Sequence, residues 1–596
     1  MDQILRVDVS RGTIAAEPLP ESWRELGGRG LVARIALDEI PPDCHPLGPH
    51  NKLIFTVGLL AATPLPCSGR LSAGGKSPLT GGIKESNAGG VLAAKLARLG
   101  FRALVVEGEP SPDVPEFNSG TSGGRRGGPG WGQVLYVSRD RLELRPAGDL
   151  AGLGVYAAAA KLRAAFGPKA ALALVGPAGE GRLPAAGIAT LDKDGNPSRY
   201  CARGGMGAVM GAKGLKAIVV DDTGGANPPP AHREAFRTAM GRYTQILQTN
   251  PQTSQVYTFY GTAAMVSMAN TYGGLPTCNF SFGQFSGAEA ISGERLHDLI
   301  LERGGEGDLT HACMPGCVIK CSNVFAGPDG KAIVSPLEYE TIGLLGSNLG
   351  LADLDAIARL NWLCNDVGLD TIEIGAALAV AAEAGVLDFG DAVAAAMLIE
   401  EAREGTPLGR LVGSGAMAVG RSFGNIRVPA VKGQAMSAYE PRAVKGTGVT
   451  YATSPQGADH TAGLTIRAKI DHLKPEGQAA LSKKTQVNVA AFDTMGLCLF
   501  VTPAVGWEHQ VMVDLLNARF GSRRPPEYIT ELGRRVLGLE LEFNRRAGFL
   551  PLDDRLPEFM AQEPLPPHQV VFDVSGEDLA GVFEDLRSRG SGEQGS

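Results

Sequence analysis

Three consecutive prolines, residues 228–230, divide this chain into two parts with different hydrophobic patterns. Consecutive prolines disfavour both helix and strand pairing, so they mark a boundary. After them, apolar residues recur with a period near 3.6 and predict helices, as at 351–366 and 371–387. Before them, short apolar runs bounded by Gly and Pro predict β strands at 4–8, 52–57, 103–107, 171–175 and 217–220. The pattern predicts an α+β fold with a β-rich first part.

The length of 596 residues exceeds what one hydrophobic core supports, so we expect several domains. We place a β-rich domain at 1–222, a mainly helical domain at 223–424 and a second mainly helical domain at 425–587. The composition also predicts an exposed loop at 119–130 and a disordered polar tail at 588–596.

The charge balance argues against nucleic-acid and membrane binding. The formal net charge is −7 and no long Lys/Arg run is present. The N-terminus lacks the pattern of a signal peptide, and no segment offers about 18 uncharged apolar residues in a row. We therefore expect a cytoplasmic protein whose partners are small molecules or proteins. Glycine clusters at 86–90 and 203–207 would let the backbone approach such a ligand closely.

A group of cysteines indicates a metal site. Cys313, Cys317 and Cys321 are each separated by three residues, and Cys498 lies far downstream. Three thiolates on one segment with a distant fourth are typical of a four-iron cluster. Zinc would accept four thiolates too, although its ligands more often come as two short pairs. A radical-SAM cluster has a different spacing, and small buried cysteines can also group by chance.

The chain resembles the tungsten-containing aldehyde:ferredoxin oxidoreductases. The likeness covers essentially the whole chain, from 4–8 to 543–544 and 556–559, in one shared order of motifs. The informative segments are 76–81, 203–211, 338–340, 368–372 and 493–498. The resemblance implies a β base under two helical domains, with the cofactor at their interface. It also implies a bis-pyranopterin centre carrying tungsten or molybdenum, a [4Fe–4S] cluster and a Mg²⁺ ion bridging the pterin phosphates.

The family binds its two pterins through loops of the form Asp-x-x-Gly-Leu-(Asp or Cys). The second loop is intact here as Asp493, Gly496, Leu497 and Cys498, whereas the first begins with Asn365. A carboxylate accepts two pterin N–H groups, but an amide offers one acceptor and one donor, so Asn365 should bind differently. The remaining first-loop residues are Gly368, Leu369 and Asp370. The positions that match the phosphate-binding residues of the family are Arg70, Asn87, Gly89, Arg199, Ala202 and Arg203.

Glu340 and His460 match the positions of two catalytic residues of the family. The resemblance implies oxidation of an aldehyde to a carboxylic acid, with Glu340 as general base and His460 orienting the substrate oxygen. Taken alone, Glu340 could be an ion-paired carboxylate and His460 a satisfied buried imidazole. Electrons would pass through the cluster to ferredoxin or to an iron–sulfur or flavin partner subunit. A cationic stretch holding Arg467, Lys469, Lys474, Lys483 and Lys484 is a candidate docking site, or simply a solvated face.

Three departures limit the transfer from the family. Archaeal relatives space the first three cysteines by two and then three residues, and a family Lys near the catalytic His is Ala462 here. Arg359 occupies the place of a Glu that holds an intersubunit metal in some relatives, so we expect no such metal and leave oligomerisation open. Two other hypotheses stay open: a family enzyme acting on a non-aldehyde substrate with a dedicated partner subunit, and an electron-transfer subunit that keeps the cluster without pterin.

Overall fold

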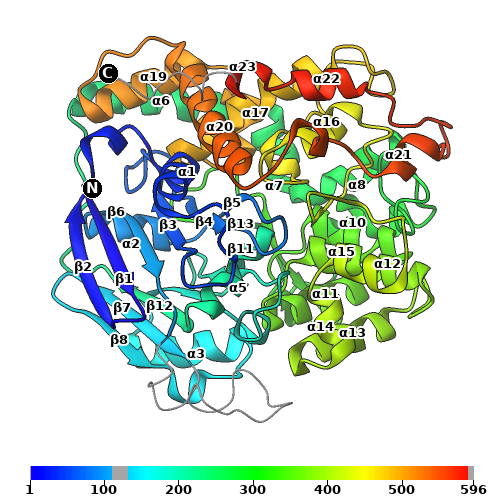
Figure 1. Cartoon of the computed structure of the whole chain (residues 1–596), viewed down its shortest axis with the longest axis horizontal. Helices are drawn as coiled ribbons and strands as arrows, with labels where there is room; N and C mark the ends of the chain where they lie inside the picture. The colour runs from blue at the N-terminus through cyan, green and yellow to red at the C-terminus, as the bar shows by residue number, and fades with distance from the viewer. Residues whose placement is uncertain (1, 111–131, 588–596) are drawn as a thin grey trace.

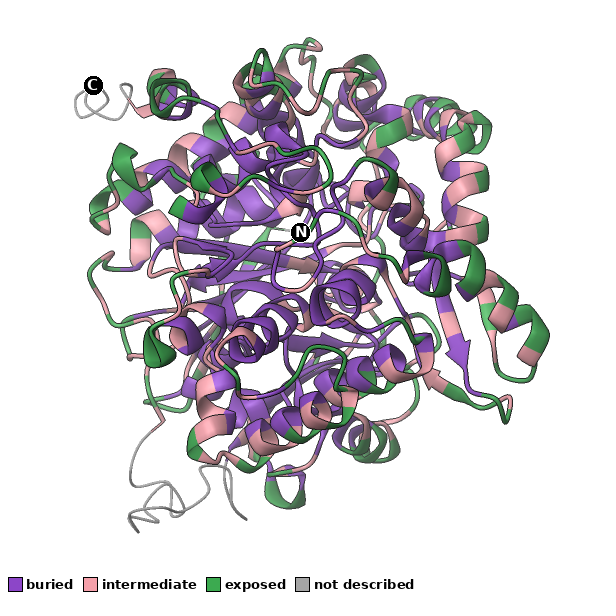
Figure 2. Cartoon of the chain, turned by 90° about the vertical axis from the view of Figure 1, so that its right-hand side faces the viewer, coloured by how far each residue is buried: buried purple, intermediate pink, exposed green. Residues whose placement is uncertain are grey.

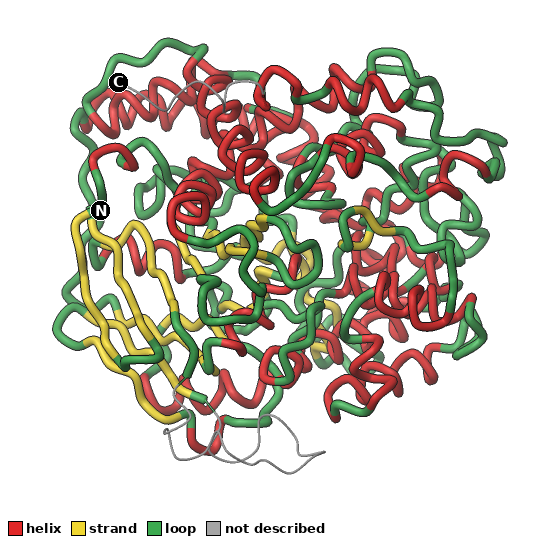
Figure 3. Tube along the Cα trace, viewed as in Figure 1, coloured by secondary structure: helices red, strands yellow, loops and turns green. Residues whose placement is uncertain are grey.

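The structure, a computed structural model, describes residues 2–110 and 132–587. The loop expected at 119–130 and the tail expected at 588–596 lie outside the described residues. The first 221 residues form two six-stranded sheets, and helices dominate from Arg233 onward, which confirms the predicted α+β class (Figures 1 and 3).

The first sheet has the strand order β2-β1-β6-β3-β4-β5. Strand β3, an uninterrupted apolar run, is buried along its whole length, as expected for a central strand. β1 and β6 pair in parallel, and the remaining neighbours are antiparallel. The strands are β1 (Gln3–Asp8), β2 (Thr13–Pro18), β3 (Leu53–Val57), β4 (Leu71–Lys76), β5 (Ile83–Ala88) and β6 (Phe101–Glu107).

The second sheet has the order β11-β10-β9-β12-β7-β8, again with one parallel pair, β12 with β7. Helix α2 (Leu92–Arg98) contacts strands of both sheets. One apolar core includes side chains from both, among them Phe55 and Ile218, so the two sheets form one base. The strands are β7 (Gln133–Ser138), β8 (Leu142–Pro146), β9 (Ala171–Leu174), β10 (Ile188–Thr190), β11 (Arg199–Cys201) and β12 (Leu215–Asp221).

Helices cover this base and enclose most of the buried residues (Figure 2). The longer ones are α1 (Gly28–Glu39), α3 (Val155–Phe166), α6 (Arg233–Thr249), α9 (Gly293–Arg303), α11 (Leu354–Val367), α12 (Thr371–Glu383), α13 (Ala392–Glu404), α17 (Gln478–Met495), α19 (His509–Phe520) and α20 (Tyr528–Arg546). The shorter ones are α4 (Pro177–Glu180), α5 (Met206–Ala212), α7 (Tyr257–Tyr260), α8 (Met265–Thr271), α10 (Tyr339–Leu345), α14 (Pro407–Val412), α15 (Ala416–Phe423), α16 (Lys445–Thr453), α18 (Thr502–Val505), α21 (Glu558–Gln562), α22 (Gly576–Gly581) and α23 (Glu584–Arg587).

Two small sheets lie within the helical part. β16 (Ala430–Val431) pairs with β17 (Gln434–Ala435), and β14 (Ser322–Ala326) pairs with both β13 (Asp308–His311) and β15 (Ala332–Val334). The connection between β13 and β14 carries the three clustered cysteines.

No single described helix is long and apolar enough to cross a membrane. One pair, Gln478–Met495 with Leu499–Val505, reaches that length and composition only together, across a bend of 120°.

A buried ion pair joins the first and last parts of the chain. Arg29 of α1 donates to both carboxylate oxygens of Glu540 of α20 at 2.7 and 2.8 Å. Both side chains are almost fully buried. Removing one partner of such a pair leaves an uncompensated charge in the interior.

Arg29→Leu should therefore lower the free energy of unfolding by about 3–5 kcal/mol, because Glu540 stays buried without its cation. The midpoint of urea denaturation measures the loss. The matched control is Arg237→Leu, which removes an exposed pair with Glu234 and should cost less than about 1 kcal/mol. Equal shifts in the two variants would contradict a structural role for the buried pair.

Candidate functional site

The residues singled out in the sequence meet in one cavity of about 290 Å³ between the β base and the helices. Its walls come from Arg70 just before β4, from β5, the β11–α5 segment, the β13–β14 connection, α10, the segment 459–461, and the ends of α11 and α17. The predicted site residues that line it are Arg70, Asn87, Gly89, Arg199, Ala202, Arg203, Cys313, Cys321, Glu340, Asn365, Leu369, Asp370, His460, Asp493 and Cys498. Gly368, Gly496, Leu497 and Cys317 are not part of the lining.

The first loop is the C-terminus of α11. Gly368 adopts φ +83° and ends the helix, with its N–H and that of Leu369 both donating to the carbonyl of Cys364. A Cβ at Gly368 would lie 2.9 Å from the backbone nitrogen of Gly176, just beyond β9. The backbone N–H of Gly187 donates to the carbonyl of Gly368, and the backbone N–H of Asp370 donates to the carbonyl of Ala185. The loop is thus fixed to the second sheet.

The second loop has the same construction at the C-terminus of α17. Gly496 adopts φ +78°, and a Cβ there would lie 2.8 Å from the Cα of Gly58, just beyond β3. The N–H of Cys498 donates to the carbonyl of Cys67 at 2.9 Å, and that of Arg70 to Gly496. This loop is fixed to the first sheet, so each sheet carries one loop.

The residues at the starts of the two loops have different surroundings. Burial raises the pKa of Asp493 to about 6, although Arg29 opposes this. The Asn365 amide donates to the Tyr156 hydroxyl at 3.3 Å. Neighbouring Asp366 does not replace the missing carboxylate, since it accepts from Arg403 and from the Tyr156 N–H.

The three arginines of the cavity differ in how many of their N–H groups the protein uses. Arg203 donates to Asp370, Ser437, Ala458 and Ala435, so it ties the first loop to the segments at 435–437 and 458. Arg70 donates to the side chain and carbonyl of Asn87. Arg199 donates to Ser322 at 2.8 Å, and among the described residues its buried Nε has no hydrogen-bond partner. Arg199 and Arg70 therefore retain donors for an anionic ligand.

Glu340 and His460 face each other at the cavity wall. Glu340 Oε2 accepts from the Ala438 N–H at 2.7 Å, and Oε1 lies 3.3 Å from His460 Nε2. Oε1 is buried and has no hydrogen-bond partner in the described part of the chain. Burial raises the pKa of Glu340 to about 8 and lowers that of His460 to about 4. The imidazole is therefore neutral at pH 7, with Nδ1 2.8 Å from Ser437 Oγ.

Asp459 was not identified from the sequence, although it precedes His460. Burial alone would raise its pKa, but Lys84 and Arg203 outweigh burial and hold that pKa far below its usual range. Asp459 is thus an ionised, fully paired carboxylate behind the histidine. Its ion pair with Lys84 is buried on both sides.

The four predicted ligand cysteines lie together as free thiols. Burial raises the pKa of the Cys498 thiol to about 12, Arg70 opposes this, and Cys313 and Cys317 add to the rise. Burial also raises the pKa of the Cys321 thiol, and the other three thiols add to the rise. A fifth thiol, Cys67, is buried with its Sγ 3.9 Å from that of Cys317. The sequence did not indicate Cys67 as part of this group, because it lies far along the chain from the other cysteines.

Comparison with known proteins decides the family. Residues 4–222 match the family described as "Aldehyde ferredoxin oxidoreductase, N-terminal domain", and residues 238–580 match "Aldehyde ferredoxin oxidoreductase, domains 2 & 3". The chain belongs to this family. It is 32% identical to the tungsten-containing aldehyde ferredoxin oxidoreductase of Pyrococcus furiosus over 591 residues, which is 95% of this chain and 92% of the relative.

Two more distant similarities carry other names. The "Aliphatic sulfonate oxidoreductase, WOR-like subunit" of Pyrococcus furiosus is 25% identical over 90% of this chain and 85% of its own length. The complex BamBC of benzoyl coenzyme A reductase shares the fold with a TM-score of 0.75 at 20% identity, covering 93% of this chain and 90% of that one. The family to which this chain belongs is one of oxidoreductases.

Proposed function

We propose that this chain oxidises aldehydes to carboxylic acids at a bis-pyranopterin centre carrying tungsten or molybdenum, beside a [4Fe–4S] cluster. An aldehyde and water give a carboxylic acid, two protons and two electrons, and the electrons leave singly for ferredoxin or a similar acceptor. The observation that carries the proposal is that the Glu340–His460 pair and the cysteines open into one cavity between two equivalent Gly-Leu loops. We further propose a cytoplasmic location.

The cavity suits the two pterins. Arg199 and Arg70 retain unused N–H groups for phosphate, and Gly89, which directly follows β5, leaves room because a Cβ there would reach Cys313 Sγ at 3.0 Å. Asp493 faces the cavity as a carboxylate acceptor for pterin N–H groups. Asn365 offers an amide at the equivalent place, so the two pterins would be held unequally. The proposed Mg²⁺ would bridge their phosphates.

The cysteines suit the cluster. Cys313, Cys317 and Cys321 come from one irregular segment, and Cys498 approaches from the second loop. A cuboidal cluster needs one thiolate per iron from different directions, which this arrangement provides. Because Asp493 and Cys498 belong to the same loop, one pterin and the cluster would be neighbours. The distance for electron transfer between them would therefore be short.

When bound, the metal–pterin centre supplies the two-electron acceptor for the substrate. Glu340 is the proton acceptor. Above about pH 8 its carboxylate is ionised, and Oε1, which has no hydrogen-bond partner among the described residues, can accept the proton released as water adds to the carbonyl carbon. His460, neutral at pH 7, can donate from Nε2 to the aldehyde oxygen while Nδ1 accepts from Ser437. Arg203 donates to Ser437, the hydrogen-bond partner of His460, and so helps to hold the imidazole in place.

A second candidate is a non-aldehyde substrate with a partner subunit. The relative named as a "WOR-like subunit" of a sulfonate oxidoreductase favours it, as does the family Lys that is Ala462 here. Assays of purified protein with aliphatic and aromatic aldehydes and a viologen dye separate the two. Dye reduction with an aldehyde supports aldehyde oxidation, and its absence with metal-loaded protein supports the second candidate.

Elemental analysis tests the cofactors first. Protein purified from cells supplied with tungstate and molybdate should contain about four irons and one tungsten or molybdenum per chain. Four irons without either heavy metal would instead identify a cluster-only electron-transfer protein.

Cys317→Ala should abolish the broad visible absorbance of the cluster, because one iron loses its thiolate. The absorbance spectrum of the purified variant, recorded with its iron content, is the measurement. Cys44→Ala is the matched control, since Cys44 is also a free cysteine but its charged neighbours are Lys76, Lys213 and Asp43 and not the ligand thiols. A Cys317 variant with the parental spectrum and iron content would refute the ligand assignment.

Glu340→Gln should retain both cofactors and lower kcat/KM by about two to four orders of magnitude, as for a lost general base. Because burial raises the pKa of Glu340 to about 8, the base is protonated and inactive below that pH. For the parent, kcat/KM should rise with pH and level off above about 8, and Glu340→Gln should lack this rise. A parental profile without this rise, or a variant that keeps it, would exclude Glu340 as the base.

A further inference from the structure

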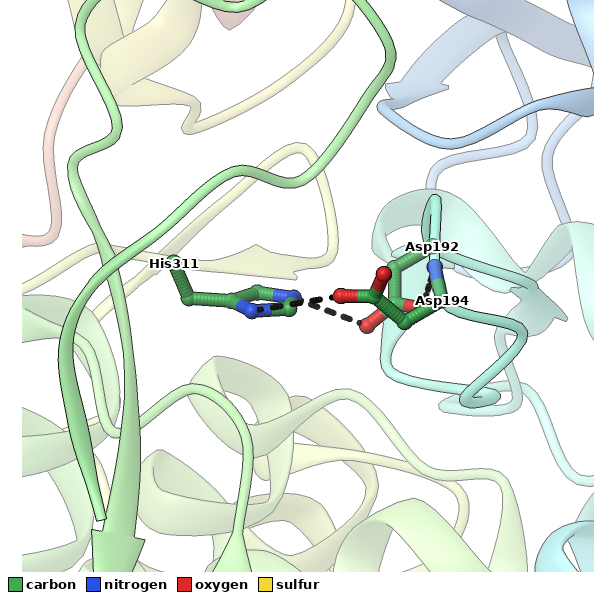
Figure 4. A group of neighbouring side chains, drawn as sticks. All are labelled: Asp192, Asp194 and His311. Carbon is green, nitrogen blue, oxygen red and sulfur yellow. Dashed lines mark hydrogen bonds and ion pairs between the residues drawn. The ribbon is translucent and has the colours of Figure 1, made fainter. Parts of the chain in front are cut away.

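His311, the last residue of β13, is a buried imidazole with acidic groups on both sides. Its Nε2 lies 3.0 Å from Asp192 Oδ2, and its Nδ1 lies 3.7 Å from Asp194 Oδ2 and 3.7 Å from Asp308 Oδ2. Figure 4 shows the ring pointing at the two aspartates of the β10–β11 loop. Only 6% of His311 is exposed. None of these residues lines the redox cavity.

Asp192 fixes the tautomer of the imidazole. Its Oδ1 accepts the N–H groups of Asp194 and Asn196 at 2.9 Å, and its Oδ2 accepts the Ser198 hydroxyl at 3.0 Å. This carboxylate is held as an acceptor, so His311 donates Nε2–H to it. The lone pair of Nδ1 is then directed toward Asp194 and Asp308, and Nδ1 makes no hydrogen bond with any described residue.

We propose that His311 Nδ1, Asp194 and Asp308 bind a divalent transition-metal ion of the zinc class, and that Asp192 positions the histidine ligand. A carboxylate that accepts the other N–H of a metal-bound histidine is a usual feature of such sites. Metal–ligand bonds of about 2.1 Å separate tetrahedral ligand atoms by about 3.4 Å, close to the 3.7 Å found here. Among the described residues, Asp192, Asp194 and His311 bring ligand atoms within 4.8 Å of one another. Asp308 lies 3.7 Å from the imidazole and would move toward Asp194 when the ion binds.

The surroundings favour a cation of this class. Three carboxylates face one imidazole, and Lys193, which pairs with Asp194 at 2.6 Å, is an exposed side chain that an ion would displace. Asp194 and Asp308 are each 48% exposed, so water can complete the coordination. A surface pocket of about 660 Å³ lined by Asp192 and Asp194 gives access. The nitrogen ligand disfavours Ca²⁺ and Mg²⁺, which prefer oxygen.

The ion would join two parts of the chain that hold the redox cavity. The loop 191–198 leads into β11, which carries Arg199, and His311 precedes Cys313 by two residues. The site acts as a clamp between the second sheet and the cysteine segment. It is distinct from the cluster and the pterins and does not depend on the function proposed above.

The test is calorimetric titration of Zn²⁺ into purified protein that carries its cluster and has been dialysed against a chelator. The parent should bind one equivalent, and Asp194→Asn and Asp308→Asn should each weaken binding at least tenfold. Asp192→Asn should weaken it by about 10–100-fold, as for a lost outer carboxylate. The conservative changes at the two half-exposed aspartates keep the test valid if His311→Ala fails to fold.

Asp298→Asn is the matched control, because Asp298 lies 3.1 Å from His297 in an exposed His–Asp pair and should leave Zn²⁺ binding unchanged. Co²⁺ in place of Zn²⁺ should give weak visible bands without thiolate charge-transfer absorbance, which distinguishes this site from the cysteines. The proposal is overturned if the parent binds no stoichiometric Zn²⁺, if Asp194→Asn and Asp308→Asn bind like the parent, or if Co²⁺ shows thiolate bands. In those cases the group is a cluster of hydrogen bonds and ion pairs that holds no metal.

Discussion

The site depends on the contact between a helix-ending glycine and a glycine at the end of a β strand, made once on each sheet. Gly368 packs against Gly176, and Gly496 packs against Gly58, at distances that leave no space for a Cβ. Both helix-ending glycines have positive φ, which ordinary side chains avoid. These contacts hold the C-terminal ends of α11 and α17 against the base. The two loops that line the cavity lie at these helix ends, so their positions depend on the glycine contacts.

Buried charge is the second constraint, and it holds each of the two loops in place. Arg203 connects Asp370 of the first loop with the backbone at Ala435 and Ala458. Arg29 connects Asp493 of the second loop with Glu540. Each guanidinium is surrounded by acceptors that would be left buried and unpaired if either helix shifted, so the position of each loop is strongly specified.

Much of this could be predicted from the sequence. Strands such as 52–57 and 103–107 were evident because their residues are buried on both faces and form continuous apolar runs. The helices 351–366 and 371–387 were evident from their periodicity, with observed bounds of 354–367 and 371–383. The composition of the segment 87–99 favours one helix, but its first two residues end β5 and α2 begins only at Leu92. These two residues adopt strand conformation because they pair with β4, and no local sequence pattern reveals a partner strand.

The site residues were found by motif order, whereas their partners were not. Cys67, Asp459 and Ser437 reach the cavity through long-range packing, and none belongs to a motif. The same holds for His311, whose only local signal is its place two residues before Cys313. Its carboxylate neighbours Asp192 and Asp194 are more than a hundred residues away in sequence. Spacing along the chain can show which residues share a segment, but contacts between segments require the fold.

The two loops share one backbone arrangement but end in different side chains, so the two ends of the cavity differ chemically. The second loop ends in Cys498 among the other thiols, whereas the first ends in Asp370, which caps α12 and accepts from Arg203. The proposed cluster would therefore lie beside only one of the two proposed pterin positions. The Glu340–His460 pair contacts the segment around Ser437 and Ala438 instead, away from the thiols. Substrate chemistry and electron exit are thus supported by different elements, because the equivalent loops end in different side chains.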